Sequence, residues 1–446
     1  MSSLPQLATA LQQVLQLAPL TLEATTGFCQ RRSKCTAALF VQTTVLGWAA
    51  NPAATLAELA GVSAACGVTL SPQALEQRLR TPAAAQLLEQ VLAHVVQQAL
   101  PGLPTTLPLL QRFPAVLVLD STTVRLPDAL APIWAGCGGS SPAHTQAAVK
   151  LSVRLDLVTG RLDGPALSPG REQDRATVGQ HHAVPAGALR IADRGFWSLA
   201  VLQHIREDAG HFLSYLPVQT VLSDPDTRTR LELLSWLETQ AEEQPDGRRC
   251  CDRPVLLGGR HHLPARLLAW QESPATRDGR AERLRAHARH KGDRPSRRAL
   301  ERTGWTLIVT SLPAERLTPA EARALLEARW QIELLFKCWK SLAGLDCWRT
   351  ANPQRIQCEV LAKAIGCVLQ HWLVCCAWQR PDRSFTHALA LIRDAVLAIA
   401  LALADHLRLL DLLAQLTHAL ARLPGVQKRP HRPATFQRLA NAPNVP

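Results

Sequence analysis

The sequence predicts an α/β protein in which a sheet, flanked by helices, lies between helical regions at the two ends of the chain. Three observations predict this class: apolar residues recur every three or four positions over the first 105 residues, short apolar or alternating runs follow, and the helical spacing returns toward the C-terminus. With 446 residues, 47% of them hydrophobic, the chain is long enough for two to four domains and at least one large core.

The first region, residues 1–105, is predicted to be helical throughout. Stretches such as "AAAQLLEQVLAHVVQQAL" have the apolar spacing of an amphipathic helix, and Ser71 before Pro72 has the residue types that begin one. A bundle of this kind could place a helix in a DNA groove. Its helix-turn-helix pattern is loose, however, so a packing or dimerisation domain is an equal alternative.

The next segment has the patterns of β-strands. "AVLVLD" is a short apolar run that ends at Asp120, and "ALRIAD" is a second run that ends at Asp193. Between them "VKLSVRLDL" alternates strictly, which predicts a half-buried strand with Lys150 and Arg154 on its polar face. "HFLSYL" is predicted to be the last strand of this segment.

Residues 218–305 have weaker, shorter strand patterns such as "PVLLGG", followed by a basic segment. Between Arg277 and Arg302, ten Lys or Arg residues stand against four acidic ones, a net charge of +6 out of +13 for the whole chain. This basic segment is a candidate contact for phosphate groups, and a solvated mobile loop is the alternative.

The rest of the chain is predicted to be helical after one more strand, "GWTLIVTSLP". In the helix "EARWQIELLFKCWKSL", one carboxylate, Glu333, stands among Arg329, Lys337 and Lys340, and spacings of four, four and three residues put all of them on one face. A solvated ladder of paired charges is the alternative interpretation. The last residues, "QKRPHRPATFQRLANAPNVP", are predicted to be a disordered tail.

Charge and cysteine content narrow the classes of function. The net charge of +13 and the pI near 9.6 favour a polyanionic partner. Nucleic acid is favoured over a membrane surface, because the most apolar runs are too short or too interrupted to span a bilayer. The N-terminus has no pattern of a secretion signal, which predicts a cytosolic protein. Twelve cysteines include no CxxC pair, which argues against zinc.

Two strands that end in aspartate suggest a metal site, because parallel neighbours bring their C-terminal ends to the same edge of a sheet. Either aspartate alone is weak support, since an acid at a strand end is often only a loop cap. Glu333, on a helix packed across that edge, would complete a set of carboxylates that holds two divalent cations close together. Hard cations such as Mg²⁺ prefer these oxygen ligands, whereas histidine or cysteine would favour zinc.

Three short motifs resemble the signatures of a known family. "DST" at Asp120, "ADRGFW" at Asp193 and "RWQIELLFKCWK" around Glu333 are similar to those of the DDE transposases of bacterial insertion sequences, in particular the insertion-sequence-four family. That family's third signature is Tyr, two residues, Arg, three residues, Glu, six residues and Lys. Here the last three places match and Leu326 stands at the Tyr place. The resemblance covers roughly residues 115–345, and the third motif is the most specific.

The resemblance implies a particular architecture. We expect an RNase H-like catalytic core, with a mixed sheet flanked by helices, that is interrupted by a mostly β insertion. The expected regions are a helical DNA-binding or dimerisation domain (1–105), the first part of the core (106–217), the inserted β domain with the basic segment (218–305), the second part of the core with the catalytic helix (306–378), and a helical C-terminal region with its tail (379–446).

The resemblance also implies an activity, namely metal-dependent cleavage of DNA at transposon ends and strand transfer into target DNA. Asp120, Asp193 and Glu333 would be both the catalytic residues and the ligands of two Mg²⁺ ions, with Asp120 between the ions, and Mn²⁺ is expected to substitute. The partner would be double-stranded DNA, as terminal inverted repeats and as target, and the protein would be a dimer on it. The location would be the bacterial cytoplasm, at the nucleoid, with no role at a membrane.

Further side chains are expected to contact DNA. Arg329 and Lys340 would hold phosphates near the scissile bond, and Lys337 would assist them or only keep the surface soluble. Arg194 would contact DNA or pair with a neighbouring acid. Trp305 would stack on an extruded base if the ends form hairpins, and a core position at the start of a strand is the alternative.

Two other functions stay open at the level of the sequence. One is a catalytically inactive DNA-binding relative that occupies element ends, and the presence of all three acids argues against it. The other is a different RNase H-like nuclease, such as a junction resolvase. The long segment between Asp193 and Glu333 and the Arg-Glu-Lys helix argue against that.

Overall fold

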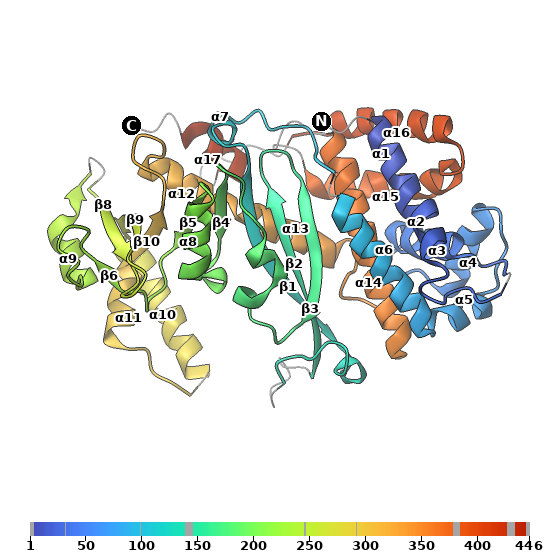
Figure 1. Cartoon of the computed structure of the whole chain (residues 1–446), viewed down its shortest axis with the longest axis horizontal. Helices are drawn as coiled ribbons and strands as arrows, with labels where there is room; N and C mark the ends of the chain where they lie inside the picture. Colours follow the sequence, from blue (N-terminus) through green and yellow to red (C-terminus); the bar gives the residue numbers. More distant parts are fainter. Residues whose placement is uncertain are drawn as a thin grey trace.

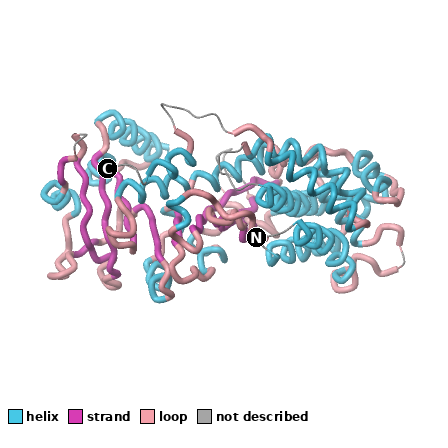
Figure 2. Tube along the Cα trace, turned by 90° about the horizontal axis from the view of Figure 1, so that it is seen from above, coloured by secondary structure: helices cyan, strands magenta, loops and turns pink. Residues whose placement is uncertain are grey.

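The computed structural model describes residues 4–31, 33–98, 100–138, 146–244, 247–290, 292–377, 384–425 and 433–442. Two units lie next to each other along the long axis of the molecule (Figure 1). One is a helical unit built from both ends of the chain, and the other is an α/β unit organised around one large sheet. Seen from above, the strands occupy one half of the molecule and most helices the other (Figure 2).

The sheet is mixed, as the predicted fold class requires. Its strands are β1 (Val116–Leu126), β2 (Ala147–Asp156), β3 (Leu162–Pro169), β4 (Leu189–Ala192), β5 (His211–Tyr215), β6 (Leu222–Ser223), β7 (Glu242–Glu243), β8 (Arg249–Leu257), β9 (Leu263–Gln271) and β10 (Trp305–Thr310). Within the described residues the order is β3-β2-β1-β4-β5-β10-β9-β8-β6, and β7 pairs with β8. β4 is parallel to both of its neighbours, β1 and β5, and the other pairs are antiparallel. The α/β class with helices around a mixed sheet is therefore confirmed.

Helices cover both faces of the sheet. α8 (Leu199–Glu207) and α9 (Leu233–Gln240) lie on one face, whereas α12 (Pro319–Ala328) and α13 (Trp330–Ser341) belong to the core on the other. The side chains of β10 alternate between the two faces of the sheet. Leu307 and Val309 pack in the core with α8 and α9, whereas Ile308 packs in the core with α12 and α13. Each such buried side chain contributes about 1.5–3 kcal/mol of burial free energy, so both layers are well supported.

The segment 218–305 differs from the expected mostly β domain. Its strands β6 to β9 continue the core sheet, and it also contains α9, α10 (Pro274–His290) and α11 (Arg297–Glu301). The basic segment is thus mainly helical, not a loop. Its inner side is anchored, because Arg280 Nη2 donates to Glu272 Oε1 and to Thr306 Oγ1, both at 3.1 Å.

The helical unit combines the two ends of the chain. Its helices are α1 (Leu4–Gln12), α2 (Ala18–Leu22), α3 (Ala37–Ala50), α4 (Leu56–Ala65), α5 (Pro72–Leu79), α6 (Pro82–Gln98), α14 (Pro353–Ala377), α15 (Phe385–Ala402) and α16 (His406–Ala421). α14 runs through the centre and packs against α3, α6, α15 and α16. The predicted helix start at Ser71 is confirmed, since its side chain accepts a hydrogen bond from the backbone N–H of Ala74.

Two of these helices, α14 and α15, are long and apolar enough to cross a bilayer if only length and composition are counted. In α14, 83% of the most apolar window is buried inside the protein, and in α15 the share is 39%. α14 is therefore the core helix of the bundle, which explains its apolar composition.

Two predictions about the strands near Asp120 are wrong. β1 does not end at Asp120 but continues to Leu126, because β2 pairs with it along this whole length. β2 is not half-buried either: Lys150 is 7% exposed and Ser152 only 3%. The segment after β3 covers Lys150, whose Nζ donates to Glu172 O and to Asp174 Oδ1, and the 3₁₀-helix η4 (Val178–His181) also packs on this strand.

The predicted disordered tail is also wrong for the part that is described. Residues Thr435–Asn441 form α17, which packs against α12 and buries Leu439. Arg438 forms an ion pair with Glu327 of α12. The remaining parts of the predicted tail, 427–432 and 443–446, lie outside the described residues.

Candidate active site

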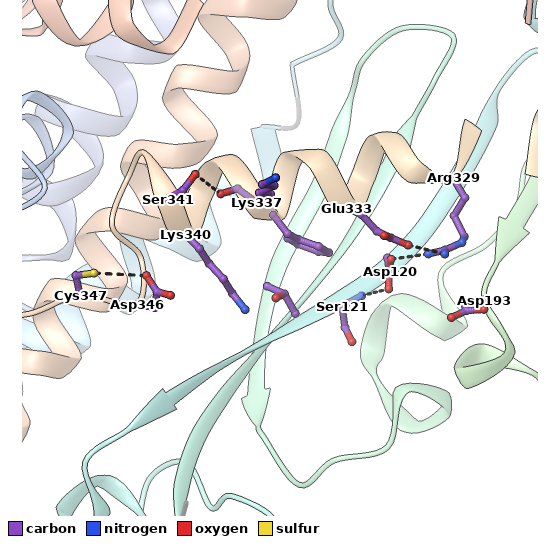
Figure 3. A pocket seen from close by; sticks show the side chains of 12 residues that line it. Asp120, Ser121, Asp193, Arg329, Glu333, Lys337, Lys340, Ser341, Asp346 and Cys347 are labelled. Carbon is purple, nitrogen blue, oxygen red and sulfur yellow. Dashed lines mark hydrogen bonds and ion pairs between the residues drawn. The ribbon is translucent and has the colours of Figure 1, made fainter. Parts of the chain in front are cut away.

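A hollow of about 750 Å³ lies between β1, the segment after β4, and α13 (Figure 3). Its lining contains acids from all three elements and two lysines. The lining residues are Asp120, Ser121, Thr122, Asp193, Arg329, Glu333, Phe336, Lys337, Lys340, Ser341, Asp346 and Cys347. The structure thus brings together the three acids that the sequence singles out.

The sheet places the two aspartates. β1 and β4 are parallel, and their last paired residues are Leu119 and Ala192, so Asp120 and Asp193 follow at the same edge. Each carboxylate is oriented by the next peptide: the N–H of Ser121 donates to Asp120 Oδ1 at 2.8 Å, and the N–H of the residue after Asp193 donates to Asp193 Oδ1 at 2.7 Å. The two acids therefore come together as expected, although only the pairing of β1 with β4 ends here and β1 itself continues to Leu126.

The third acid comes from α13, which packs across β1. The helix buries Ile332, Leu335, Phe336 and Trp339 against the core, and this leaves Glu333 on the side that faces the hollow. The predicted shared face is present, because the three basic residues of the motif line the same hollow as Glu333.

Arg329 lies between two of the acids. It is the residue at which α12 ends and α13 begins, and its guanidinium donates from Nη1 to Asp120 Oδ2 at 2.8 Å and from Nη2 to Glu333 Oε1 at 2.5 Å (Figure 3). The side chains of Arg329 and Asp120 are only 15% and 16% exposed. This is a largely buried, charge-assisted pair of hydrogen bonds, which is a strong type of polar contact in a protein.

Electrostatics in the hollow reflect crowded carboxylates. The pKa of Asp120 is raised to about 6, mainly by burial and also by the nearby charges of Asp193 and Glu333. The Ser121 N–H and Arg329 act in the opposite direction and lower it. Burial alone would lower the pKa of Arg329, but the three carboxylates outweigh it and the pKa is raised. The hollow therefore favours a bound positive charge.

The donor set fits a hard divalent cation, since the three acids offer only carboxylate oxygens. In their present positions, however, the three acids are not close enough together to hold a metal ion, and neither is any other group of three Asp, Glu, His or Cys side chains among the described residues. The guanidinium of Arg329 already fills the place between Asp120 and Glu333. A metal ion at these two carboxylates would therefore displace Arg329.

The two lysines of the motif differ. Lys340 reaches from α13 to β1, where its Nζ donates to Thr123 O at 2.9 Å, and burial lowers its pKa. Lys337 is exposed at the rim. Both therefore border the hollow, but only Lys340 is fixed by a contact to the strand that carries Asp120.

A buried lysine fixes the loop at the far end of the hollow. Lys363 of α14 is 3% exposed, and its Nζ donates to Gly344 O at 3.0 Å and to Cys347 O at 2.5 Å. Its charge is balanced by Glu359 at 3.0 Å. Since an unpaired buried ammonium is costly, this arrangement holds the loop after α13 against the helical unit.

The side chains of two predicted DNA contacts do not line the hollow of the three acids, although Arg194 directly follows Asp193. The guanidinium carbon of Arg194 lies 5.3 Å from the ring centre of Tyr215, a cation–π contact. Trp305 is half-buried at the start of β10 and lines a second hollow of about 1280 Å³ with residues of α10 and α11. Neither side chain is among the described residues that line the hollow of the three acids.

Sequence patterns missed two residues near this site. Tyr215 is the only tyrosine in the chain, and it lines a third hollow with Leu326 and Arg329; burial raises its pKa. Leu326, at the family's Tyr place, is 2% exposed and belongs to the core. The second missed residue, Asp174, accepts a hydrogen bond from Ser121 Oγ at 2.7 Å. It stands at no strand end, so no pattern marks it.

Comparison with known proteins identifies relatives. The model of the family described as the transposase DDE domain matches residues 111–369. The chain is 25% identical over 321 residues to the transposase for insertion sequence element IS231F of Bacillus thuringiensis subsp. israelensis, which covers 69% of this chain and 66% of that protein. The transposase for IS231B of Bacillus thuringiensis subsp. berliner is 23% identical over 319 residues, 68% of this chain and 65% of that protein.

A further relative comes from another element. The InsL protein of insertion sequence element IS186A from Escherichia coli K12 is 26% identical over 263 residues, which is 56% of this chain and 67% of InsL. The chain thus spans slightly less than two thirds of the IS231 transposases that it matches. The family match covers β1 to β10 and the helix of Glu333, so the core of the α/β unit is RNase H-like, as expected.

Proposed function

Because the chain belongs to the transposase DDE domain family, we propose that it cuts DNA at the ends of a mobile element and joins the cut ends to target DNA. The observation that carries this proposal is the meeting of Asp120, Asp193 and Glu333, from three elements far apart in sequence, in one hollow. Nothing in the structure or among the relatives favours an inactive DNA-binding protein or a different nuclease.

The three carboxylates would hold the divalent cations, Mg²⁺ or in its place Mn²⁺, and the family pattern implies two ions. Such cations lower the pKa of a bound water or 3′-hydroxyl and stabilise the leaving oxygen of an in-line displacement. Asp120, at the centre of the group, would contribute to both places, with Asp193 and Glu333 on either side.

The basic residues of the hollow would hold the DNA backbone. Lys340 and Lys337 border the acids, where their charges would contact phosphates beside the scissile bond. Arg329, once released from Asp120 and Glu333, would provide a bidentate contact to a phosphate. Arg194 lies just after Asp193 and would contact the same DNA.

The second hollow would take the DNA end. β10 is antiparallel to β5 and β5 is parallel to β4, so Trp305 lies toward the sheet edge at which β4 ends and Asp193 follows. Four arginines of α10 and α11 line this hollow with the indole: Arg277, Arg285, Arg297 and Arg298. A base stacked on Trp305, with its phosphates held by these arginines, is the use of this hollow that we propose.

The partners follow from the reaction. Strand transfer joins two ends to one target, so we propose a dimer on double-stranded DNA that carries terminal inverted repeats. The net charge of +13 supports such a partner. We place this activity in the bacterial cytoplasm, at the nucleoid.

We also propose five domains, although helices of the first and the last pack into one unit. The domains are 1–105, 106–217, 218–305, 306–378 and 379–446.

The test uses the full chain and DNA that carries the terminal repeats beside its gene. With Mg²⁺, we expect nicks at the 3′ ends of the element and joined products, resolved strand by strand on a denaturing gel. Chelation of Mg²⁺ should abolish both products and leave end binding intact. DNA that is bound but never cut, with Mg²⁺ or Mn²⁺, would identify an inactive relative. Cleavage of branched junctions in preference to ends would identify a different nuclease.

A further inference from the structure

β1 and β4 separate just where the two aspartates stand. Leu119 and Ala192 are the last pair in the parallel ladder between these strands, and Asp120 and Asp193 come directly after it. Beyond this pair the ladder no longer fixes one chain against the other. The spacing of the two carboxylates therefore depends on what packs between the diverging segments.

Asp174 lies in this fork. It begins the 3₁₀-helix η3 (Asp174–Ala176), and its Oδ1 accepts a hydrogen bond from the hydroxyl of Ser121, the residue after Asp120, at 2.7 Å. Its Oδ2 lies against Gly195, two residues beyond Asp193, so closely that a Cβ at that position would come within 2.6 Å of it. One carboxylate thus contacts the segments that follow both aspartates.

A buried lysine holds Asp174 in place. Lys150 of β2 is 7% exposed, and its Nζ donates to Asp174 Oδ1 at 2.7 Å and to Glu172 O at 2.5 Å. Burying an ion pair is not in itself stabilising, because desolvation of both charges offsets their attraction. An apolar residue on this strand would avoid that cost, so the pair is better explained by what it positions than by stability.

Asp174 is not placed to be a ligand itself. Lys150 neutralises it, Ser121 occupies the same oxygen, and it is not among the described residues that line the hollow of the three acids. We propose that Asp174, held by Lys150, is a positioning residue that sets the spacing of Asp120 and Asp193 for divalent cations. This inference rests on the proposed function.

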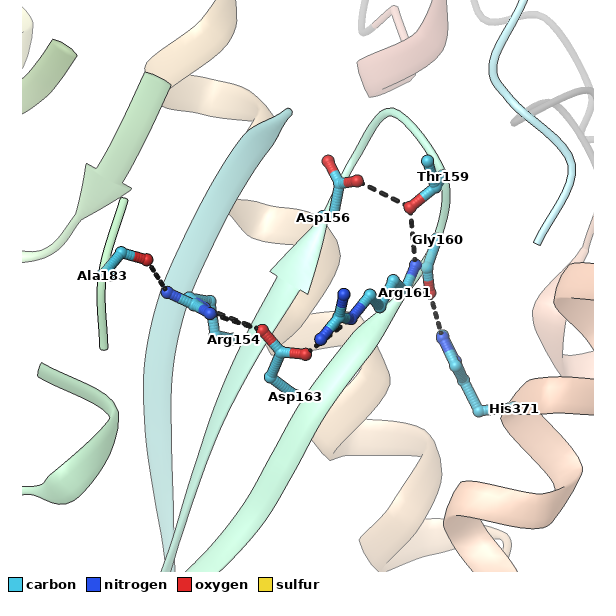
Figure 4. Close-up of polar contacts among 8 residues, drawn as sticks. All are labelled: Arg154, Asp156, Thr159, Gly160, Arg161, Asp163, Ala183 and His371. Carbon is cyan, nitrogen blue, oxygen red and sulfur yellow. Dashed lines mark hydrogen bonds and ion pairs between the residues drawn. The ribbon is translucent and has the colours of Figure 1, made fainter. Parts of the chain in front are cut away.

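The chain offers a matched control in the pair Arg154 and Asp163 (Figure 4). Arg154 Nη2 donates to Asp163 Oδ2 at 2.6 Å, and the two side chains are 14% and 12% exposed. Like the pair of Lys150 and Asp174, this ion pair joins β2 to an acid later in the chain, here on β3. The pair also contacts Arg161 and Ala183 O, and neither of these residues lies in the segments that follow Asp120 and Asp193.

The experiment compares Asp174→Asn with Asp163→Asn in the full chain. Mg²⁺ affinity is measured by titration calorimetry with end DNA present, and nicking is measured across a range of Mg²⁺ concentrations. Loss of a group that orients metal ligands typically weakens metal binding about 10- to 100-fold. We expect Asp174→Asn to weaken Mg²⁺ binding by that amount and to raise the Mg²⁺ concentration for half-maximal nicking. Asp163→Asn should leave both near wild type.

Gly195→Ala provides a second, independent variant. Its Cβ would push the carboxylate of Asp174 aside without removing any charge, so it should also weaken Mg²⁺ binding. If Asp174→Asn does not fold, the Mg²⁺ affinity of Gly195→Ala tests the positioning role of Asp174 instead. Wild-type Mg²⁺ affinity in the folded variants of Asp174 and Gly195, or an equal loss in Asp163→Asn, would overturn the inference.

The two proposals fail in distinguishable ways. A wild-type chain that binds Mg²⁺ but never nicks its end DNA overturns the proposed function alone, because the Mg²⁺ affinities of the variants are compared without cleavage. A wild-type chain that binds no Mg²⁺ overturns both.

Discussion

The guanidinium of Arg329 rests against the carboxylate of Asp120, with Nη1 and Oδ2 2.8 Å apart, although 209 positions separate the two residues in the sequence. The same guanidinium also binds Glu333. A positive charge thus already lies where the proposed function requires divalent cations. Arg329 and a metal ion would compete for the same oxygens, and the balance between them is open to measurement.

Replacing Arg329 by alanine should strengthen Mg²⁺ binding and weaken the metal-free protein. The carboxylates of Asp120 and Glu333 would lose their hydrogen-bond partner, which should lower the free energy of unfolding by about 1.5–3 kcal/mol without metal. Loss of the competing cation should raise Mg²⁺ affinity about tenfold, as a coupling of roughly 1.4 kcal/mol implies. Calorimetric titration and thermal unfolding with and without Mg²⁺ measure both effects.

Arg323 is the control for this variant. It pairs with Glu327 on α12, at 3.4 Å, and neither residue lines the hollow among the described residues. Arg323→Ala should change stability by less than about 0.5 kcal/mol, as exposed pairs four residues apart usually do. If Arg329→Ala binds Mg²⁺ no better than Arg323→Ala, Arg329 does not occupy the cation site.

Trp305→Ala should slow the opening or hairpin step at a DNA end more than the first nick. Stacking of a base on an aromatic ring contributes about 1–3 kcal/mol, so we expect about a tenfold difference between the two steps in time courses resolved by strand. Trp236 is the control, because it also packs partly buried against the same core but does not line the second hollow among the described residues. Equal slowing of both steps in Trp305→Ala would assign the indole to packing.

Protonation of the buried His371 should make the protein less stable as the pH falls below about 6.5. Burial lowers the pKa of His371 from its ordinary 6.5, and its Nε2 lies 2.7 Å from Gly160 O at the turn between β2 and β3 (Figure 4). The unfolded chain takes up a proton at the ordinary pKa, whereas the folded protein resists it. Stability is therefore complete above pH 6.5 and is lost as the pH falls toward the folded-state pKa.

Chemical denaturation of wild type and His371→Gln between pH 5 and 8, a range set by the ordinary histidine pKa, measures this effect. The glutamine amide can still donate to Gly160 O, so the variant should lose part of the pH dependence below 6.5. His406→Gln, at an exposed position, should follow wild type. Parallel curves for wild type and His371→Gln would show that protonation of this ring does not affect stability.

The candidate site was largely predictable from local patterns. Two apolar runs that each end in an acid indicate strands that meet at one edge, and the spacing from Arg329 to Lys340 indicates one helix face. Both are short-range properties of the backbone. Asp174 was not predictable in this way, because its contacts with Ser121 and Gly195 depend on how η3 folds back across the sheet.

Long-range packing explains the other differences. The alternation in β2 showed two faces but not that the segment with Glu172 and Asp174 folds over the polar one and buries Lys150. α10 has little hydrophobic surface, yet Arg, Ala and Glu are good helix formers. Hydrogen bonds from Arg280 to Glu272, just after β9, and to Thr306 of β10 hold the helix in place. α17 forms from a tail of low hydrophobicity because it docks on α12.

The most direct test of the central claim, that Asp120, Asp193 and Glu333 form one metal-dependent cutting site, is strand-resolved cleavage of end DNA by Glu333→Ala in Mg²⁺. Glu327→Ala is the matched control, since Glu327 lies on the neighbouring helix and pairs with Arg323 and Arg438. We predict that Glu333→Ala still binds the ends but neither nicks nor joins them, while Glu327→Ala does both. Nicking and joining by Glu333→Ala at the wild-type rate would contradict the account.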